Sequence, residues 1–119
     1  MHTLKESVIV YKNCEGPNGG SVLVTLRLQK GTLINKNINW AGKNRASRAK
    51  VIRIQGIRRD FYYRVDKDRT IAFAHHRRGF TYKVGKIVKP ESAFSRGHQE
   101  CASGIHFFKD KDMALHYWA

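Results

Sequence analysis

Hydrophobic and polar residues alternate along short stretches of this chain, and glycine, asparagine or aspartate residues separate the stretches. Such alternation is typical of β-strands with one buried face, because successive side chains of a strand point to opposite sides. The clearest case covers residues 22–29, where Val22, Val24, Leu26 and Leu28 alternate with Leu23, Thr25, Arg27 and Gln29. The pattern predicts a strand with an apolar inner face and a more polar outer face.

Turn signals between these stretches predict hairpins. Residues 7–11 form a first expected strand, and residues 15–20 contain three glycines and a Pro-Asn pair that suit a tight turn before residues 22–29. Further short runs rich in β-branched or aromatic residues predict strands at 50–54, 61–65, 70–74, 80–84 and 104–108. Turns are expected between them at Gly56 and at residues 66–68, 77–79 and 90–92.

One helix is predicted at the end of the chain, over residues 110–118. Asp110 is suited to cap it and Asp112 to its first turn. Its apolar face would be formed by Met113, Ala114, Tyr117 and Trp118. Residues 31–48 carry the least regular pattern and are expected to form a long surface loop. The fold class that follows is mainly β (α+β), with residues 1–119 forming a single small antiparallel β domain with a short C-terminal helix.

The length and composition are compatible with one compact core. The chain has 119 residues, of which 41% are hydrophobic, so a second sizeable domain is excluded. No run approaches the roughly 18 apolar residues that a membrane span needs, and the first residues lack an apolar signal core. We therefore expect a soluble, cytoplasmic protein without membrane contact. The two cysteines, Cys14 and Cys101, are far apart in the sequence and are expected to be free.

The net charge of the chain gives the first indication of function. Lys and Arg number 23 against 9 Asp and Glu, a formal net charge of +14. Solubility asks for a net charge of roughly 2–8 in a small domain. The excess is also segregated, because residues 16–59 and 69–90 contain no acidic residue. The segregation favours a surface that binds phosphate-rich anions, above all nucleic acid.

The candidate ligand-binding residues are basic groups of segment 43–59 and of the turn at 75–78, with two aromatic residues nearby. Trp40 lies in the irregular stretch, and Tyr62 points away from Phe61 and Tyr63, so these two rings are the candidates for stacking on bases. We expect Arg45 and Arg48 to lie on the surface loop, where glutamate in their place would weaken binding and spare folding. The full set is Trp40, Lys43, Arg45, Arg48, Lys50, Arg53, Arg58, Arg59, Tyr62, His75, His76, Arg77 and Arg78.

The sequence supports a metal site or a catalytic site less strongly than an anion-binding surface. His98, Cys101 and His106 supply three metal-ligating side chains where a structural zinc site needs four, so no metal and no cofactor is expected. Cys101 and His106 could form a nucleophile and base, and this enzyme alternative stays open beside a structural role for both residues. The glycine-rich, HExxH and GxSxG signatures of common nucleotide-binding and hydrolytic enzymes are absent. The sequence thus favours a non-enzymatic binding protein.

Residues 82–90 read Y-K-V-G-K-I-V-K-P, and residues 100–108 read E-C-A-S-G-I-H-F-F. These segments resemble the Y-x-V-G-x-x-V-x-P and E-C-x-x-G-I-H-F-F hallmarks of an uncharacterised domain from phage and giant-virus proteins, which is often found beside pentapeptide repeats. The resemblance implies a viral or phage origin and a small β-rich unit, and it brings no established activity. This chain departs from the usual setting because it has no pentapeptide repeats and has an unusually basic middle.

Two partner classes besides nucleic acid remain open at this point. A phage counter-defence protein that sequesters a cyclic nucleotide signal would need a few cations around a cleft, for instance at a homo-oligomer interface. A basic inhibitor would instead mask an acidic surface on a host protein target. The charge of +14 exceeds what a small nucleotide requires, so nucleic acid is the preferred partner.

Overall fold

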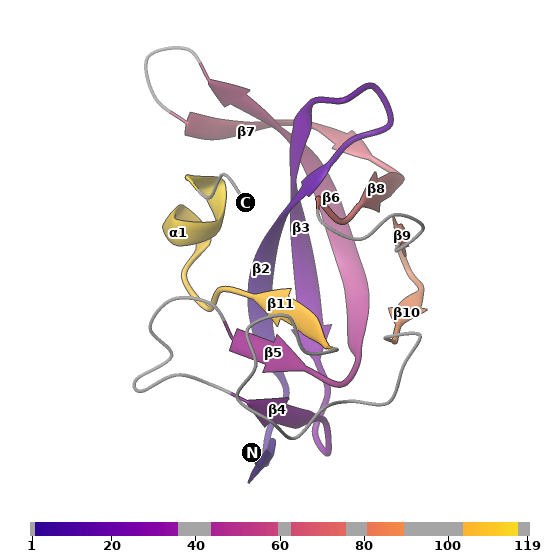
Figure 1. Ribbon diagram of the computed structural model, residues 1–119, viewed down its shortest axis with the longest axis vertical. Helices are drawn as coiled ribbons and strands as arrows, with labels where there is room; N and C mark the ends of the chain where they lie inside the picture. Colours follow the sequence, from indigo (N-terminus) through magenta and orange to yellow (C-terminus); the bar gives the residue numbers. More distant parts are fainter. Residues whose placement is uncertain (1, 36–43, 60–62, 76–80, 90–103, 117–119) are drawn as a thin grey trace.

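The computed structural model describes residues 2–35, 44–59, 63–75, 81–89 and 104–116 (Figure 1). Nearly all of the secondary structure in these ranges is antiparallel strand, which confirms the predicted fold class of a mainly β domain with a short C-terminal helix. The elements are β1 (His2–Thr3), β2 (Val8–Glu15), β3 (Ser21–Leu28), β4 (Leu33–Asn35), β5 (Asn44–Ala46), β6 (Ala49–Arg59), β7 (Tyr63–Arg69), β8 (Ile71–Phe73), β9 (Thr81–Lys83), β10 (Ile87–Val88), β11 (Ile105–Phe107) and α1 (Lys111–Leu115).

The hairpin of β2 and β3 is the centre of the fold. Its register runs without interruption from Val8 opposite Leu28 to Glu15 opposite Ser21, so the first strand extends beyond the predicted residues 7–11. The turn between the strands contains Gly19 with φ +85°, a conformation that favours glycine. The predicted hairpin and its turn are therefore confirmed.

The larger sheet curls into a small barrel. Its strand order is β10-β6-β3-β2-β8-β9, and its two ends, β9 and β10, are consecutive in the chain with three residues between them. Gly85 in this connection has φ +85°, and its backbone N–H donates to the carbonyl of Val51 on β6 at 2.8 Å. One short segment therefore bonds to β8 and to β6, and the sheet closes on itself.

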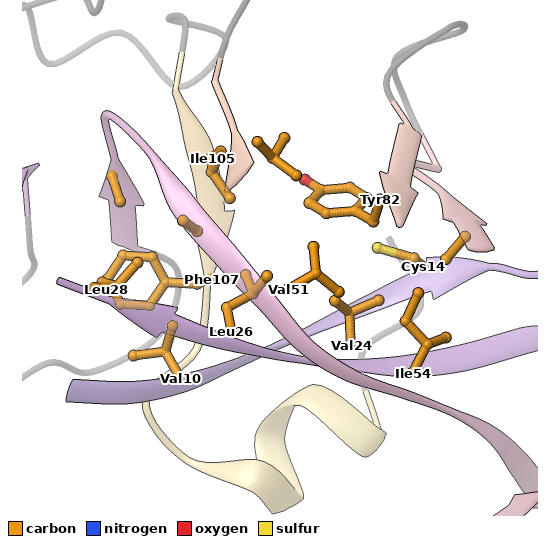
Figure 2. Packing of buried hydrophobic residues seen from close by; sticks show 14 of the residues in the cluster. Val10, Cys14, Val24, Leu26, Leu28, Val51, Ile54, Tyr82, Ile105 and Phe107 are labelled. Atoms are coloured by element: carbon orange, nitrogen blue, oxygen red, sulfur yellow. The ribbon is translucent and has the colours of Figure 1, made fainter. Parts of the chain in front are cut away.

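A second sheet, ordered β1-β4-β5-β11, packs against one end of the barrel. The backbones of Tyr11 and Phe108 exchange hydrogen bonds of 2.8 and 2.7 Å and so join the segment after β11 to β2. The interior between the two sheets is filled by buried side chains that include Leu26, Tyr82 and Phe107 (Figure 2). This core accounts for the alternation in the sequence, because Val22, Val24, Leu26 and Leu28 all belong to it.

The outer face of β2 and β3 is partly covered by α1. Leu23 points away from the barrel interior and is fully buried with Phe108, Ala114 and Leu115. Figure 2 shows the helix on one side of the strands and the interior side chains on the other. The buried Asn13 fixes the helix, since its Nδ2 donates to the carbonyl of Ala114 at 3.0 Å. Beyond Leu23, the outer face of β3 carries Thr25 and Arg27, as the alternation predicts.

Two predicted turns are wrong, because their residues lie inside strands. Gly56 belongs to β6, and the predicted turn at 66–68 belongs to β7. Gln55 pairs with Asp68 and Ile57 with Val65, so Gly56 faces two residues of β7 in a β-bulge. A Cβ atom on Gly56 would stand 3.0 Å from Nη2 of Arg69. The glycine therefore marks the place where the Arg69 side chain crosses the strand rather than a change of direction.

The predicted surface loop at residues 31–48 is also wrong in its described parts. Residues 33–35 form β4 and residues 44–46 form β5, and Ile34 and Ala46 are fully buried. Each strand has three residues, too few to show alternation, and their pairing depends on the distant β1 and β11. The same reason explains why the two-residue strands β1 and β10 were not predicted.

The predicted helix exists, and its cap is confirmed. Asp110 has extended backbone angles, and its carboxylate accepts a hydrogen bond from the N–H of Asp112 at 2.8 Å. Ala114 is buried as predicted, but Met113 is 43% exposed and its predicted place on the buried face is wrong. The bond from Asn13 to Ala114 turns this short helix so that Ala114 and its neighbour Leu115 face the sheet. Tyr117 and Trp118 lie outside the described residues.

Candidate anion-binding face

Four strands place one residue each in a row across the outer face of the barrel. Ile9 on β2 lies directly opposite Arg27 on β3, and Arg27 lies directly opposite Lys50 on β6. Lys50 in turn lies opposite Ile87 on β10. Residues directly opposite each other in an antiparallel pair share a face of the sheet, so all four side chains point away from the core.

Arg27 and Lys50 form a pair of like charges at the centre of this row. Directly opposite residues have Cβ atoms roughly 4.5–5.5 Å apart, and like charges at that separation destabilise a sheet. Neither residue forms an ion pair with a carboxylate in the described part of the chain. A bound anion between them would remove the repulsion and accept hydrogen bonds from both.

Arg53 extends this positive surface along β6. It lies opposite Thr25, which is on the same side of β3 as Arg27. Its Nε atom lies 2.8 Å from Oδ1 of Asp68, and both side chains are exposed. The hydrogen bond from Arg53, together with its charge, holds the pKa of the Asp68 carboxyl below the usual value. We call Arg27, Lys50 and Arg53 the basic face.

Two further cations lie near the Arg27 end of the basic face. Lys30 is exposed and follows β3 by two residues. Arg48 is half-buried, and its Nη2 atom lies 3.9 Å from the point where a Cβ atom would stand on Gly31. The Arg48 guanidinium thus lies beside Gly31, the residue that follows Lys30 in the turn after β3. The structure therefore groups three of the candidate site residues, Arg48, Lys50 and Arg53. Arg27 and Lys30 join them, although these two are not among the candidate ligand-binding residues predicted from the sequence.

Other candidate residues have structural contacts elsewhere. Arg45 is 7% exposed in β5, an inner strand of the four-stranded smaller sheet, so its expected position on a surface loop is wrong. Burial lowers the pKa of its guanidinium. Arg59 donates to the hydroxyl of Ser21 at 2.7 Å, and its guanidinium lies 5.3 Å from the ring centroid of Tyr63. Nε2 of His75 lies 2.9 Å from Oδ1 of Asn13. Arg59 thus links β6 to β3 and β7, and His75 links the segment after β8 to β2.

Arg58 lies on the opposite side of the sheet from the basic face. It pairs with Arg64 on β7, and its Nε atom is 3.7 Å from a carboxylate oxygen of Asp66. The flanking pair of Ile57 and Val65 packs toward α1, so Arg58 and Arg64 point the other way. The predicted segment 43–59 is thus divided over two faces and the interior.

The remaining candidates lie outside the described residues: Trp40, Lys43, Tyr62, His76, Arg77 and Arg78, and also His98 and Cys101 of the possible metal or catalytic cluster. The third member of that cluster, His106, lies on β11, and its backbone carbonyl accepts a hydrogen bond from Nζ of Lys12 at 3.0 Å. Among the residues that the structure does describe, no three His, Cys, Asp or Glu side chains gather at metal-binding distance.

Cys14 is a free thiol with no access to solvent, as its position inside the barrel requires. Burial raises its pKa from 9.0 to about 12, an effect that the nearby positive charge of Lys12 reduces. A thiol with so high a pKa is a poor nucleophile at neutral pH, because the thiolate is the reactive form. Cys14 is therefore part of the core.

We expect Cys14 to resist iodoacetamide at pH 8 in the folded protein and to react fully in urea, as peptide mapping by mass spectrometry would show. Rapid labelling of Cys14 under native conditions would contradict its burial.

The Cys14 thiol also makes stability depend on pH. The folded protein keeps the thiol proton up to about pH 12, whereas the unfolded chain loses it near pH 9.0. The contribution of Cys14 to the free energy of unfolding is therefore complete below about pH 9 and declines above it. The Cys14→Ala variant should lack this part of the alkaline loss of stability in urea titrations.

Comparison with known proteins identifies a family for this chain, but that family has no assigned activity. Residues 1–114 match a family of unknown function (DUF5758). Neither the curated proteins nor the solved structures include a significant match. In the described residues, no helix has the length and apolar character to cross a membrane. The family match spans nearly the whole chain, including the strands that form the basic face, and the chain therefore belongs to this family of unknown function.

Proposed function

We propose that this protein is a non-enzymatic nucleic-acid-binding protein whose basic face binds the phosphate backbone. The observation that carries the proposal is the direct opposition of Arg27 and Lys50 on the outer face, without an ion pair from a described carboxylate. A sheet that keeps two like charges in register loses stability, and binding of an anion offsets the loss. Arg53, Arg48 and Lys30 extend the positive charge on either side.

A polyanion fits this arrangement better than a single small anion. The cations lie along the strands and at the turn after β3, and the barrel interior is filled by side chains such as Tyr82 and Phe107. An extended ligand can contact the separate cations in turn, and each neutralised phosphate releases counterions, which strengthens binding at low salt. The net charge of +14 supports the same partner, since it accelerates association with a polyanion.

The hallmark residues at 82–90 and 100–108 support a phage or giant-virus origin as part of this proposal. A viral protein of this kind would act in the cytoplasm of the infected cell. There it would meet nucleic acid of virus and host alike, and phosphate contacts of the kind proposed do not distinguish sequences.

Salt dependence of the affinity tests the proposal. With four phosphate contacts on a single strand, the logarithm of the association constant should fall against the logarithm of salt concentration with a slope of about −3. Fluorescence anisotropy with a labelled oligonucleotide measures it, and cyclic mononucleotides serve as the comparison. Tight binding of a cyclic nucleotide without binding of the oligonucleotide, or no binding of either, would overturn the proposal.

We expect Asp68→Asn to strengthen nucleic-acid binding. The carboxylate of Asp68 competes with a phosphate for Arg53, and the amide would leave that guanidinium available without changing the size of the side chain. Affinity should rise by a few fold and the salt slope should steepen by about 0.7 for one added phosphate contact on a single strand. Asp66→Asn, which removes the same charge beside Arg58 on the other face, is the matched control. An equal gain in both variants would show that only net charge matters.

A further inference from the structure

The row that carries Arg27 and Lys50 ends in an exposed isoleucine on each side. Ile9 is 38% exposed and Ile87 is 52% exposed, although both lie in strands of the barrel. The described residues include four large hydrophobic side chains with such exposure, Ile9, Val84, Ile87 and Met113. Two of the four, Ile9 and Ile87, thus flank Arg27 and Lys50 on the same side of the sheet.

The row is short enough for one ligand to contact all of it. Neighbouring strands lie about 4.8 Å apart, so the three steps from β2 to β10 cover roughly 14 Å. A ligand seated there meets an apolar side chain, two cations and a second apolar side chain. It must therefore present negative charge and apolar surface within a few ångströms of each other.

Duplex and single-stranded nucleic acids differ in this respect. A duplex presents its phosphates and sugars on the outside and keeps the faces of its bases stacked inside, whereas a single strand can turn unstacked bases toward a protein. Every base has an apolar face, so contact with an aliphatic side chain does not depend on sequence. On a duplex, Ile9 and Ile87 would lie against the charged backbone.

We infer that the basic face selects single-stranded nucleic acid, with phosphates on Arg27 and Lys50 and unstacked bases against Ile9 and Ile87. The inference rests on the proposed function and names the form of nucleic acid that the same site takes. It uses the outer row alone, and Arg58 and Arg64 on the other side of the sheet have no part in it.

The test compares a labelled 20-nucleotide oligodeoxythymidine with a 20-base-pair duplex by fluorescence anisotropy at one salt concentration. The Ile9→Thr/Ile87→Thr variant keeps β-branched residues in both strands and removes the aliphatic ends. We expect it to bind the oligodeoxythymidine roughly tenfold more weakly, with an unchanged salt slope and unchanged duplex affinity. Val84→Thr/Met113→Gln, which alters the other two exposed hydrophobic residues, should bind like the natural protein.

Three results would overturn the inference: tighter binding of the duplex by the natural protein, an equal loss for both ligands in the isoleucine variant, or an equal loss in the control variant. A protein that binds neither ligand would refute the proposed function itself, so the two failures are distinguishable. Thermal melts accompany each measurement, and if the double variant melts early, Ile87→Thr alone gives the answer because Ile87 is the more exposed of the two.

Discussion

Replacing both Arg27 and Lys50 by glutamate is expected to weaken nucleic-acid binding about a hundredfold at low salt while the barrel stays folded. The change removes two phosphate contacts and puts two carboxylates in their place, so the ligand is repelled where it was attracted. The salt slope on a single strand should flatten by about 1.4, which is 0.7 for each lost contact. Both side chains point away from the core, so folding does not depend on them.

The matched control is Arg58→Glu/Arg64→Glu. It changes the net charge by the same amount, again at two directly opposite residues, but on the other side of the sheet. An equal loss of affinity in both variants would contradict the assignment of binding to one face. Arg27→Glu alone adds a further check, because it converts the like-charged pair into an opposite-charged one and should raise stability by about 0.5 kcal/mol.

Arg45→Glu is expected to destabilise the fold by about 3 kcal/mol, contrary to the expectation from sequence that this position tolerates the change. Arg45 lies in β5 between β4 and β11, where it faces Asn35 and His106, and it is 7% exposed. A shorter carboxylate at this place would lose the contacts of the guanidinium and remain cut off from water. Urea titration monitored by fluorescence would show the lowered midpoint.

Arg48→Glu provides the comparison for Arg45. Arg48 is half-buried, lies between β5 and β6, and has its guanidinium beside Gly31 rather than inside a sheet. We expect a loss of about 1 kcal/mol or less, with reduced affinity for nucleic acid because Arg48 flanks the basic face. Equal urea midpoints for the two variants would mean that the burial of Arg45 does not matter to stability.

The fold was largely predictable because its main strands bury one face. Alternation in residues 22–29 placed β3 and distinguished its two sides, and the Asp110 cap placed the helix. The sequence did not predict the elements that are too short to show an alternating pattern of hydrophobic and polar residues. Strands β4 and β5 have three residues each and owe their pairing to β1 and β11, which are distant in the sequence. Glycine at position 56 predicts a turn from sequence, whereas it lies opposite a bulge in the structure, because turns and bulges favour the same residue type.

The candidate site was harder to predict than the fold, because a run of basic residues does not state which face each residue occupies. Segment 43–59 looked continuous, yet Arg45 is buried, Arg58 and Lys50 point to opposite sides, and Arg59 binds Ser21. The register of β3 against β6 decides this, and it includes a shift after Thr25 that no local pattern reveals. The signal for Arg27 was present, since it stood on the polar side of the predicted strand.

The strand β7 bears on how the protein behaves at high concentration. In the described residues it pairs with β6 alone, so its other edge has backbone donors and acceptors available to a strand from another molecule. Four consecutive charged residues, Asp66, Lys67, Asp68 and Arg69, occupy this edge, and the bulge opposite Gly56 distorts it. Charges and bulges at a sheet edge oppose the edge-to-edge pairing that begins aggregation. Two of the nine acidic residues of this basic protein, Asp66 and Asp68, therefore lie where they help to keep its copies apart.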